Sequence, residues 1–237
     1  MKKTTGLFLF TAVFLFVWQS YSQSPHFRKH PLPLEFKGVE IFCMFRDMNH
    51  FIWLGTSAGL VRFDGSSHKY FVQFQGKENH VNALFQDSRG ILWIGYKNGN
   101  IGQFMNDNFI KALPGFSKDP IMDFAEDTDG AIWVGTYGQG AAVFGKNDTI
   151  KFTRETGLAD DYVNALTEDG IGNVYVGTDQ GISICSTSTA GAAAVPFNTE
   201  HDLPDNIVTT ISRDSGGQIW VGTEFAGICR FGPTTRL

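Results

Sequence analysis

Apolar residues recur along this chain in short blocks that are separated by glycines and polar turns. The blocks Ile132-Trp133-Val134 and Ile219-Trp220-Val221 are apolar at three successive positions, where a half-exposed strand would alternate. Continuous apolar runs of this length are typical of strands that are buried on both faces. No segment keeps a 3.6-residue apolar period over three helical turns. We therefore predict an all-β protein with almost no helix.

One phrase centred on an aromatic residue recurs five times. The aromatic residues are 40, 40, 42 and 45 residues apart, at Trp53, Trp93, Trp133, Tyr175 and Trp220. An aspartate stands six positions before each of them, at Asp47, Asp87, Asp127, Asp169 and Asp214. A fixed period of this size with strand-like content predicts stacked β-propeller blades, each unable to bury its apolar faces alone.

Each repeat predicts a four-stranded blade. The first strand ends at the recurrent aspartate, and an Asp-x-x-Gly turn follows with glycine in the positive-φ position. The first repeat has His50 in place of that glycine, which predicts a strained or differently shaped turn. A glycine two residues after each aromatic residue indicates close backbone approach or a bulge. The fourth strand is the least regular, and Pro196 restricts it to an edge position or a strand start.

The N-terminal segment predicts export. Lys2 and Lys3 precede an uncharged run from residue 6 to residue 18, and Ser20 and Ser22 offer small side chains for cleavage. The apolar run is shorter than the roughly 20 residues of a spanning helix, so a secretory signal peptide is favoured over a retained membrane anchor. We predict a signal peptide at residues 1–22 and one propeller domain at residues 23–237, periplasmic or secreted.

Composition narrows the possible chemistry. Charged residues make up 18% of the chain and the net charge is -5, so no basic stripe for nucleic acid is expected. Three cysteines are an odd number for an exported protein, and Cys185 stands at a repeated apolar position, which predicts a buried thiol. No Cys-x-x-Cys pair or histidine cluster has metal-ligand spacing, so we expect no structural metal and no cofactor.

Candidate ligand-binding residues lie in the loops between second and third strands, which project together on one face of a propeller. Aromatic side chains beside amides and charges suit stacking on, and hydrogen bonding to, a small ligand such as an oligosaccharide. The alternative for each residue is an ordinary solvated turn. The candidates are Tyr96, Lys97, Tyr137, Gln139, Asp179, Glu224 and Phe225.

A propeller glycosidase or lyase is the enzymatic alternative. A glycosidase needs two carboxylates at a defined separation, one of them with a raised pKa. The five recurrent aspartates occupy one structural position in every repeat, which favours a turn-forming role over catalysis. We therefore expect no enzymatic activity, and a protein-interaction scaffold is the other non-enzymatic alternative.

The segment from Leu203 to Phe231 resembles the two-component regulator propeller repeat, whose pattern is Leu-Pro-Asp/Ser-Asn-x-Val/Ile, then Asp-x-x-Gly-x-Ile/Leu-Trp-Ile/Val-Gly-Thr. The resemblance implies a seven-bladed propeller in the periplasmic sensor region of a hybrid histidine kinase, often one that responds to carbohydrate. It also implies a downstream sensor kinase as a partner, or self-association. This chain departs in having five repeats and no kinase domain.

Two arrangements of the five repeats remain open. They form either part of a seven-bladed propeller or a closed five-bladed ring. In the ring, residues 23–35 would supply the fourth strand that the last repeat lacks, because Phe27-Arg-Lys-His aligns with earlier fourth strands. An incomplete array would instead leave exposed edges.

Overall fold

The computed structural model describes residues 37–72, 79–113, 116–144, 149–188 and 191–231. All of them lie in one compact unit, residues 33–237. The predicted signal peptide, residues 1–22, and the predicted closing strand, residues 23–35, fall outside the described residues.

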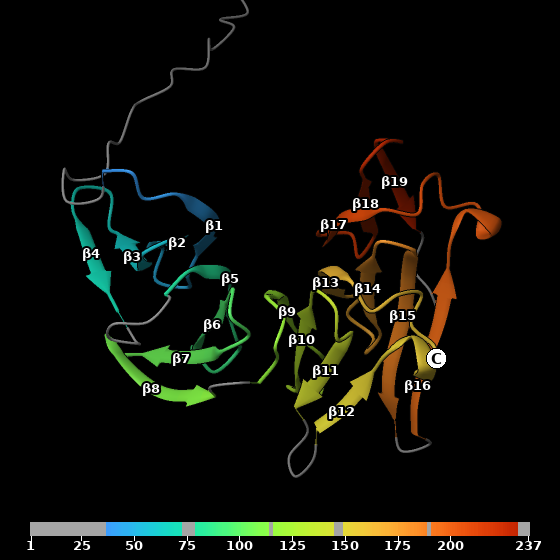
Figure 1. Ribbon diagram of the computed structural model, residues 1–237, viewed down its shortest axis with the longest axis horizontal. Helices are drawn as coiled ribbons and strands as arrows, with labels where there is room; N and C mark the ends of the chain where they lie inside the picture. The colour runs from blue at the N-terminus through green and yellow to red at the C-terminus, as the bar shows by residue number, and fades with distance from the viewer. Residues whose placement is uncertain (1–36, 73–78, 114–115, 145–148, 189–190, 232–237) are drawn as a thin grey trace, which may run out of the picture. The chain divides into compact units, whose positions relative to one another are not determined.

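Five antiparallel sheets follow one another along the chain (Figure 1). Blade 1 contains β1 (Ile41–Arg46), β2 (Ile52–Thr56), β3 (Gly59–Phe63) and β4 (His68–Phe71). Blade 2 contains β5 (Val81–Gln86), β6 (Leu92–Tyr96), β7 (Ile101–Met105) and β8 (Asn108–Leu113). Blade 3 contains β9 (Ile121–Glu126), β10 (Ile132–Thr136), β11 (Ala141–Phe144) and β12 (Thr149–Phe152). Blade 4 contains β13 (Val163–Glu168), β14 (Val174–Thr178), β15 (Gly181–Ser188) and β16 (Gly191–Phe197). Blade 5 contains β17 (Val208–Arg213), β18 (Ile219–Thr223) and β19 (Ile228–Phe231).

This architecture confirms the predicted all-β propeller blades. Strands within each sheet are neighbours in chain order, and the first strand ends directly before the recurrent aspartate. Pro196 lies in β16, the outer strand of blade 4, so its predicted edge position is confirmed. The helical structure in the described ranges consists of the 3₁₀ turns Arg154–Thr156 and Thr199–His201.

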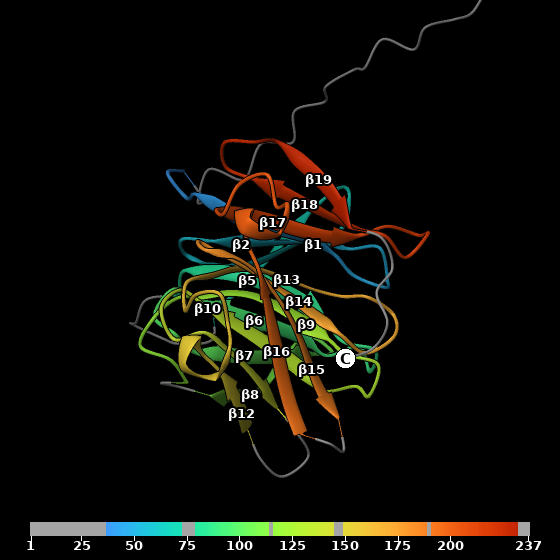
Figure 2. The same cartoon turned by 90° about the vertical axis from the view of Figure 1, so that its right-hand side faces the viewer.

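The hydrophobic core lies between consecutive blades. First strands contact one another in chain order, from β1 to β5, β9, β13 and β17 (Figure 2). Each core cluster joins the central aromatic residue of one blade to the second strand of the next. Trp53, for example, packs with Leu92 and Ile94 of blade 2. Both faces of the second strands of blades 2 to 4 are thereby buried, as the block Ile132-Trp133-Val134 predicts. The same prediction is wrong for the block Ile219-Trp220-Val221, because Trp220 is 38% exposed.

A hydrogen-bonded unit explains why aspartate and tryptophan recur together. Asp127 Oδ1 accepts backbone N–H bonds from Asp129 and Ala131 at 3.0 and 2.9 Å, and Oδ2 accepts the Trp133 indole N–H at 2.9 Å. The same indole bond forms in blades 1, 2 and 5 at 2.7–3.0 Å. Each such carboxylate therefore holds a turn and orients a tryptophan.

Blade 4 replaces this indole bond with another donor. Tyr175 has no N–H on its ring, and Asn173 Nδ2 donates instead to Asp169 Oδ2 at 2.7 Å. Asn173 is fully buried, so this amide keeps the second carboxylate oxygen hydrogen-bonded in the core.

The turn of blade 1 has the same shape as those of blades 2, 3 and 5 and is strained by its residue type. His50 N–H donates to the Asp47 carbonyl at 3.0 Å, as Gly90 N–H donates to the Asp87 carbonyl at 2.9 Å. His50 has a φ of 69°, in the left-handed region where a side chain costs free energy. The expectation of a differently shaped turn is therefore wrong, whereas the expectation of strain is confirmed.

Replacing His50 by glycine is expected to raise the free energy of unfolding by about 0.5–1 kcal/mol, because relief of the left-handed strain exceeds the added entropy of the unfolded chain. Urea denaturation of the two proteins measures the difference. Gly90→Ala is the matched control, since it introduces a side chain at the same turn position and should be destabilising. An unchanged or lower stability of His50→Gly would contradict the strain.

Candidate functional site

The residue that directly follows each second strand occupies a rim position, one in each blade. The rim N–H donates to the carbonyl of the residue at the entry of the first strand of the same blade, at 2.9–3.2 Å. These bonds fix the rim backbone and leave the side chain as the variable part. The rim residues are Ser57, Lys97, Tyr137, Asp179 and Glu224.

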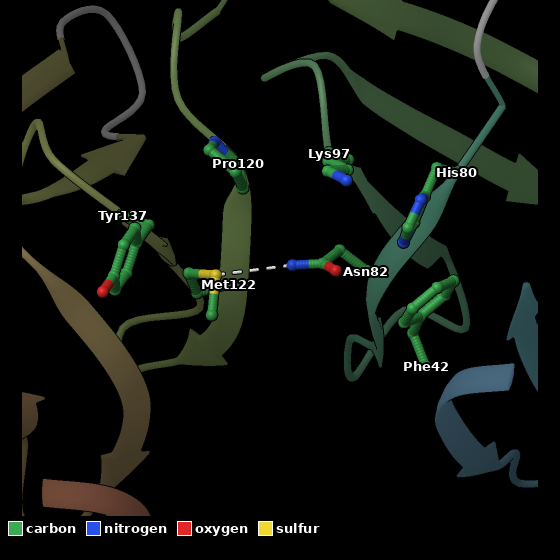
Figure 3. Close-up of a pocket in the computed structure, with 7 residues that line it drawn as sticks. All are labelled: Phe42, His80, Asn82, Lys97, Pro120, Met122 and Tyr137. Atoms are coloured by element: carbon green, nitrogen blue, oxygen red, sulfur yellow. Dashed lines mark hydrogen bonds between the residues drawn. The ribbon is translucent and has the colours of Figure 1, made fainter. Parts of the chain in front are cut away.

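A cavity of about 240 Å³ opens where the rim residues of blades 2 and 3 meet the first strands of blades 1 to 3 (Figure 3). Its walls combine three aromatic rings with apolar groups, one amide and one ammonium group. Lys97 and His80 lie on one side, and Pro120, Met122 and Tyr137 lie on the other. The lining residues are Phe42, His80, Asn82, Lys97, Pro120, Met122 and Tyr137.

Bulges in the first strands give the cavity three of its side chains. The pairing register shifts between Ile41 and Cys43, between Val81 and Ala83, and opposite Gly135 and Thr136. A bulge leaves one residue outside the ladder and re-aims its side chain. The residues at the bulges are Phe42, Asn82 and Met122.

Contacts between neighbouring blades position the cavity walls. The rings of Phe42 and His80 stack with centroids 3.7 Å apart and an interplanar angle of 27°. Asn82 Nδ2 donates to the Ile121 carbonyl at 3.1 Å and lies 3.4 Å from Met122 Sδ (Figure 3). Phe42 and Tyr137 are nevertheless 42% and 40% exposed. Aromatic surface is therefore held in place and remains accessible to a ligand.

Tyr137 links the cavity to blade 4. Its ring meets Tyr162 edge to face with centroids 5.0 Å apart, and its hydroxyl lies 3.5 Å from Asp179 Oδ2. Asn164 Nδ2 donates to Asp179 Oδ1 at 2.8 Å. The negative charge of Asp179 raises the pKa of the Tyr137 phenol, so Tyr137 stays a neutral hydrogen-bond donor at physiological pH.

A carboxyl group, that of Asp123, bridges blades 3 and 4. Asp123 Oδ2 accepts the Leu166 N–H and Oδ1 accepts its neighbour Phe124 N–H, both at 2.8 Å. Desolvation raises the pKa of Asp123 to about 6, although the two N–H donors oppose this shift. The protonation state of Asp123 is therefore linked to the packing of blade 3 against blade 4.

Two predicted candidates lie away from the cavity because the protein itself uses their side chains. Tyr96 is the last residue of β6 and is 1% exposed, so its assignment to an exposed loop tip is wrong. Gln139 Nε2 donates to Ser117 Oγ and Asp119 Oδ2, both at 3.0 Å. Both side chains are therefore engaged in contacts within the protein and are not offered to a ligand.

The other predicted candidates divide between the cavity region of blades 2 to 4 and blade 5. Lys97 and Tyr137 line the cavity, and Asp179 contacts Tyr137. Glu224 and Phe225 belong to blade 5 and do not line it, although Phe225 is 78% exposed. The structure therefore unites three of the seven candidates.

Sequence reasoning missed the cavity residues that come from the first strands. The available signal was the position directly after the first apolar residue of each first strand, which varies between repeats and is occupied by Phe42, Asn82, Met122, Asn164 and Thr209. A residue type that varies directly after a uniformly apolar position indicates a side chain that leaves the core. The residues missed were Phe42, His80, Asn82, Pro120 and Met122.

Neither a metal site nor a membrane-spanning helix is found in the parts of the chain that the structure describes. No three His, Cys, Asp or Glu side chains in those parts are grouped to hold a metal ion. No helix there combines the length and hydrophobicity needed to cross a membrane. Cys185 is fully buried, which confirms its predicted place in the core, and Cys43 and Cys229 are also free thiols.

Solved structures with the same fold include two extracellular domains of regulatory systems and an enzyme. The extracellular domain of a hybrid two component system from B. thetaiotaomicron is 28% identical over 82% of this chain and 28% of its own, with a TM-score of 0.69. The extracellular domain of a one component system from the same organism is 18% identical. The match covers 82% of this chain and 36% of that domain, with a TM-score of 0.52. Virginiamycin B lyase from Staphylococcus aureus is 16% identical. The match covers 87% of this chain and 74% of the lyase, with a TM-score of 0.62. The last two similarities concern the fold alone.

The chain spans less than a third of the length of the hybrid-system domain. No curated protein sequence matches it significantly. The family model described as two component regulator propeller matches three segments, residues 75–98, 115–138 and 202–225. These segments lie in and directly before blades 2, 3 and 5 of an array whose five blades follow one plan, so the array is similar to two component regulator propeller repeats.

Proposed function

We propose that this chain is an extracytoplasmic sensor propeller of a two-component system and that it binds a small ligand in the cavity of blades 1 to 3. The observation that carries the proposal is the convergence of Phe42, Asn82, Lys97 and Tyr137, from three consecutive blades, on one accessible cavity. Similarity to the extracellular domain of a hybrid two component system supports the sensor role. Export by way of residues 1–22 belongs to the same proposal.

The cavity favours a ligand with one ring, or one residue of a longer oligosaccharide. Its volume of about 240 Å³ is slightly below the roughly 300–1,000 Å³ of typical small-molecule sites. Phe42 and Tyr137 offer faces for stacking against the C–H surface of a sugar, and Asn82 supplies an amide. Lys97 is the charged residue of the lining, so it favours a hydroxyl-rich or negatively charged ligand.

Binding at this cavity provides a physical route to a signal. The lining comes from three blades, and Tyr137 contacts Tyr162 and Asp179 of blade 4. A ligand that contacts several blades stabilises the packing in which its contacts are best satisfied, and this shifts the population of states. A downstream sensor kinase is the partner that would read this shift.

Catalysis is not part of the proposal. The recurrent aspartates accept turn N–H bonds in every blade, and four of them also accept an indole N–H. These carboxylates are committed to the blade and are not a catalytic pair.

A thermal-shift screen of neutral and acidic mono- and oligosaccharides tests the proposal. A sugar at 100 times its dissociation constant is expected to add about 2.7 kcal/mol of apparent stability. Tyr137→Ala and Lys97→Ala are expected to remove the shift while leaving the unliganded melting temperature close to that of the wild type, because both side chains are exposed.

Phe225→Ala is the matched control, since it removes an exposed aromatic side chain far along the chain from the cavity. It should keep the full ligand shift. If Phe225→Ala lost the ligand-induced shift and Tyr137→Ala kept it, the binding site would lie in blade 5 and the proposed site would be wrong. Turnover of a screened sugar by the purified protein would contradict the binding-only role.

A further inference from the structure

A second cavity lies beside the rim residue of blade 4, and we call the cavity of blades 1 to 3 the first cavity. The volume of the second cavity, about 550 Å³, falls within the roughly 300–1,000 Å³ of typical small-molecule sites. Its walls are the segment that joins β12 to β13, the loop between β14 and β15, and the end of β16. Its polar lining residues are Arg154, Asp160, Tyr162, Gln180 and Asn198.

Two tyrosines stand between the two cavities. Tyr137 lines the first cavity, on the wall opposite Lys97 and His80, and Tyr162 lines the second cavity (Figure 3). The two tyrosine rings meet edge to face with centroids 5.0 Å apart, and their backbones form an antiparallel bridge. Tyr137 is 40% exposed and Tyr162 is 45% exposed. This tyrosine pair therefore offers aromatic surface that runs from one cavity to the other.

Hydrogen bonds hold the walls of the second cavity in place. In the segment that joins blades 3 and 4, Ala159 N–H donates to Ser183 Oγ at 2.8 Å. The Arg154 N–H donates to Asp161 Oδ1 at 2.9 Å, which fixes the start of the same segment. A wall that is held before binding loses little conformational entropy when a ligand arrives.

The polar side chains of the second cavity keep hydrogen-bonding capacity for a ligand. The guanidinium of Arg154 and the side-chain amide of Gln180 form no hydrogen bond or ion pair with any residue that the structure describes. Asp160 Oδ1 accepts the N–H of Asp161 at 2.8 Å, whereas Asp160 Oδ2 accepts no hydrogen bond from the described part of the chain. Arg154 and Gln180 are exposed, so both can reach a ligand from the rim.

This lining matches an uncharged, hydroxyl-rich ring. Arg154 supplies only donors, and the ionised Asp160 supplies only acceptors. Hydroxyl groups donate and accept, so they satisfy both residues, whereas an anion would meet Asp160 and a cation would meet Arg154. Leu158 and Pro196 add apolar surface, and the ring of Tyr162 suits stacking on the C–H face of a sugar. A neutral sugar residue is therefore the class of ligand that fits the second cavity.

We propose that the second cavity is a second subsite for the ligand of the first cavity, so that one oligosaccharide occupies both and passes over Tyr137 and Tyr162. This inference rests on the proposed function, because it takes binding in the first cavity as its starting point. The sugar residue in the second cavity is uncharged and hydrogen-bonds Arg154, Asp160 and Gln180. Such a ligand contacts four consecutive blades, whereas a single sugar ring in the first cavity contacts three.

Isothermal titration calorimetry with sugars of increasing length tests the second subsite. The probes are glucose, galactose, mannose, xylose, arabinose and galacturonic acid, each with its linear oligosaccharides of two to six residues. We expect the wild type to bind the oligosaccharides of at least one neutral series about tenfold or more tightly than the corresponding monosaccharide. The second cavity adds a hydrogen bond to a charged group and a stacking surface, and this explains the gain.

Two variants assign the gain with length to the second cavity. Arg154→Ala and Gln180→Ala are expected to remove the gain, while the monosaccharide still binds in the first cavity. Both side chains are exposed, so neither variant should affect folding. Tyr137→Ala, in contrast, should weaken the binding of every length. Lys151→Ala is the matched control, since it removes an exposed cation on β12 that lines neither cavity, and it should keep the full gain.

Three results would overturn the second subsite and leave the proposed function standing. The first is equal affinity of the wild type for a monosaccharide and its oligosaccharides. The second is a gain with length that persists in both Arg154→Ala and Gln180→Ala. The third is a gain that occurs only in the galacturonic acid series, which would contradict an uncharged residue in the second cavity. Failure of every probe to bind the wild type would instead contradict the proposed function and the second subsite together.

Discussion

Replacing Trp133 by alanine is expected to lower the free energy of unfolding by about 3–5 kcal/mol. Its side chain is 0% exposed and packs with residues of blades 3 and 4, including Phe152 and Val174. The Trp133 ring stacks on Phe152 with centroids 5.0 Å apart. Alanine would leave a cavity between two blades and an unpaired oxygen on Asp127. Guanidinium denaturation followed by circular dichroism measures the loss.

Trp220 provides the matched comparison within the same repeat. It keeps the indole bond to its aspartate at 2.8 Å but is 38% exposed, whereas Trp133 is buried between two blades. From the sequence alone, the two tryptophans are expected to be equally important. The structure predicts a clearly smaller loss for Trp220→Ala, since less apolar surface is removed from the core. Equal losses in the two variants would contradict this picture of the end blade.

Replacing Asp127 by alanine is expected to cost about 2–4 kcal/mol of unfolding free energy, the second largest effect. Three N–H donors lose their acceptor at once, at Asp129, Ala131 and Trp133. The indole donor is fully buried, so water cannot replace the lost bond without opening the core. Denaturant titration under the conditions used for Trp133 measures the change.

Asp127→Asn separates hydrogen bonding from charge. Its remaining carbonyl oxygen can accept the turn N–H groups, while its amide would face the indole N–H, so part of the stability should return. Asp129→Ala is the control in the same turn, where the side chain is exposed. If Asp127→Ala were as stable as the wild type, the recurrence of aspartate would need an explanation other than structure.

The fold was largely predictable because each structural requirement is written five times. Each repeat has an aspartate, an aromatic residue six positions later and a glycine two positions after that. Each of these residues has one structural role. The aspartate accepts the turn N–H groups, and the aromatic residue packs against the next blade. The glycine leaves room for the apolar residue of the next blade. Repetition separates such positions from chance, which a single copy cannot do.

The site was only partly predictable, because it depends on which blades are neighbours. Lys97 and Tyr137 lie in loops where a site was expected. Phe42 and Met122 reach the cavity because of strand bulges, which no local sequence motif predicts. Tyr96 directly precedes the rim residue Lys97 and is nevertheless a core residue. Its position is one that the other blades give to threonine, whose hydroxyl bonds within the loop, at Thr56, Thr136, Thr178 and Thr223.

The end blades illustrate the same limit. Trp220 and Ile41 carry the residue types of their repeats, so the sequence predicts burial for both. Their exposure depends on whether another blade lies against them, which is a property of the assembly and not of the repeat.

Backbone amide NMR of the labelled protein, titrated with the sugars of the thermal-shift screen, tests the central claim most directly. The claim is that a small ligand binds in the cavity of blades 1 to 3. We expect the largest chemical-shift changes at the amides of Phe42, Asn82, Lys97 and Tyr137, with smaller changes at Asp179. Changes confined to Glu224 and Phe225, or spread over outer strands without saturation, would contradict the claim.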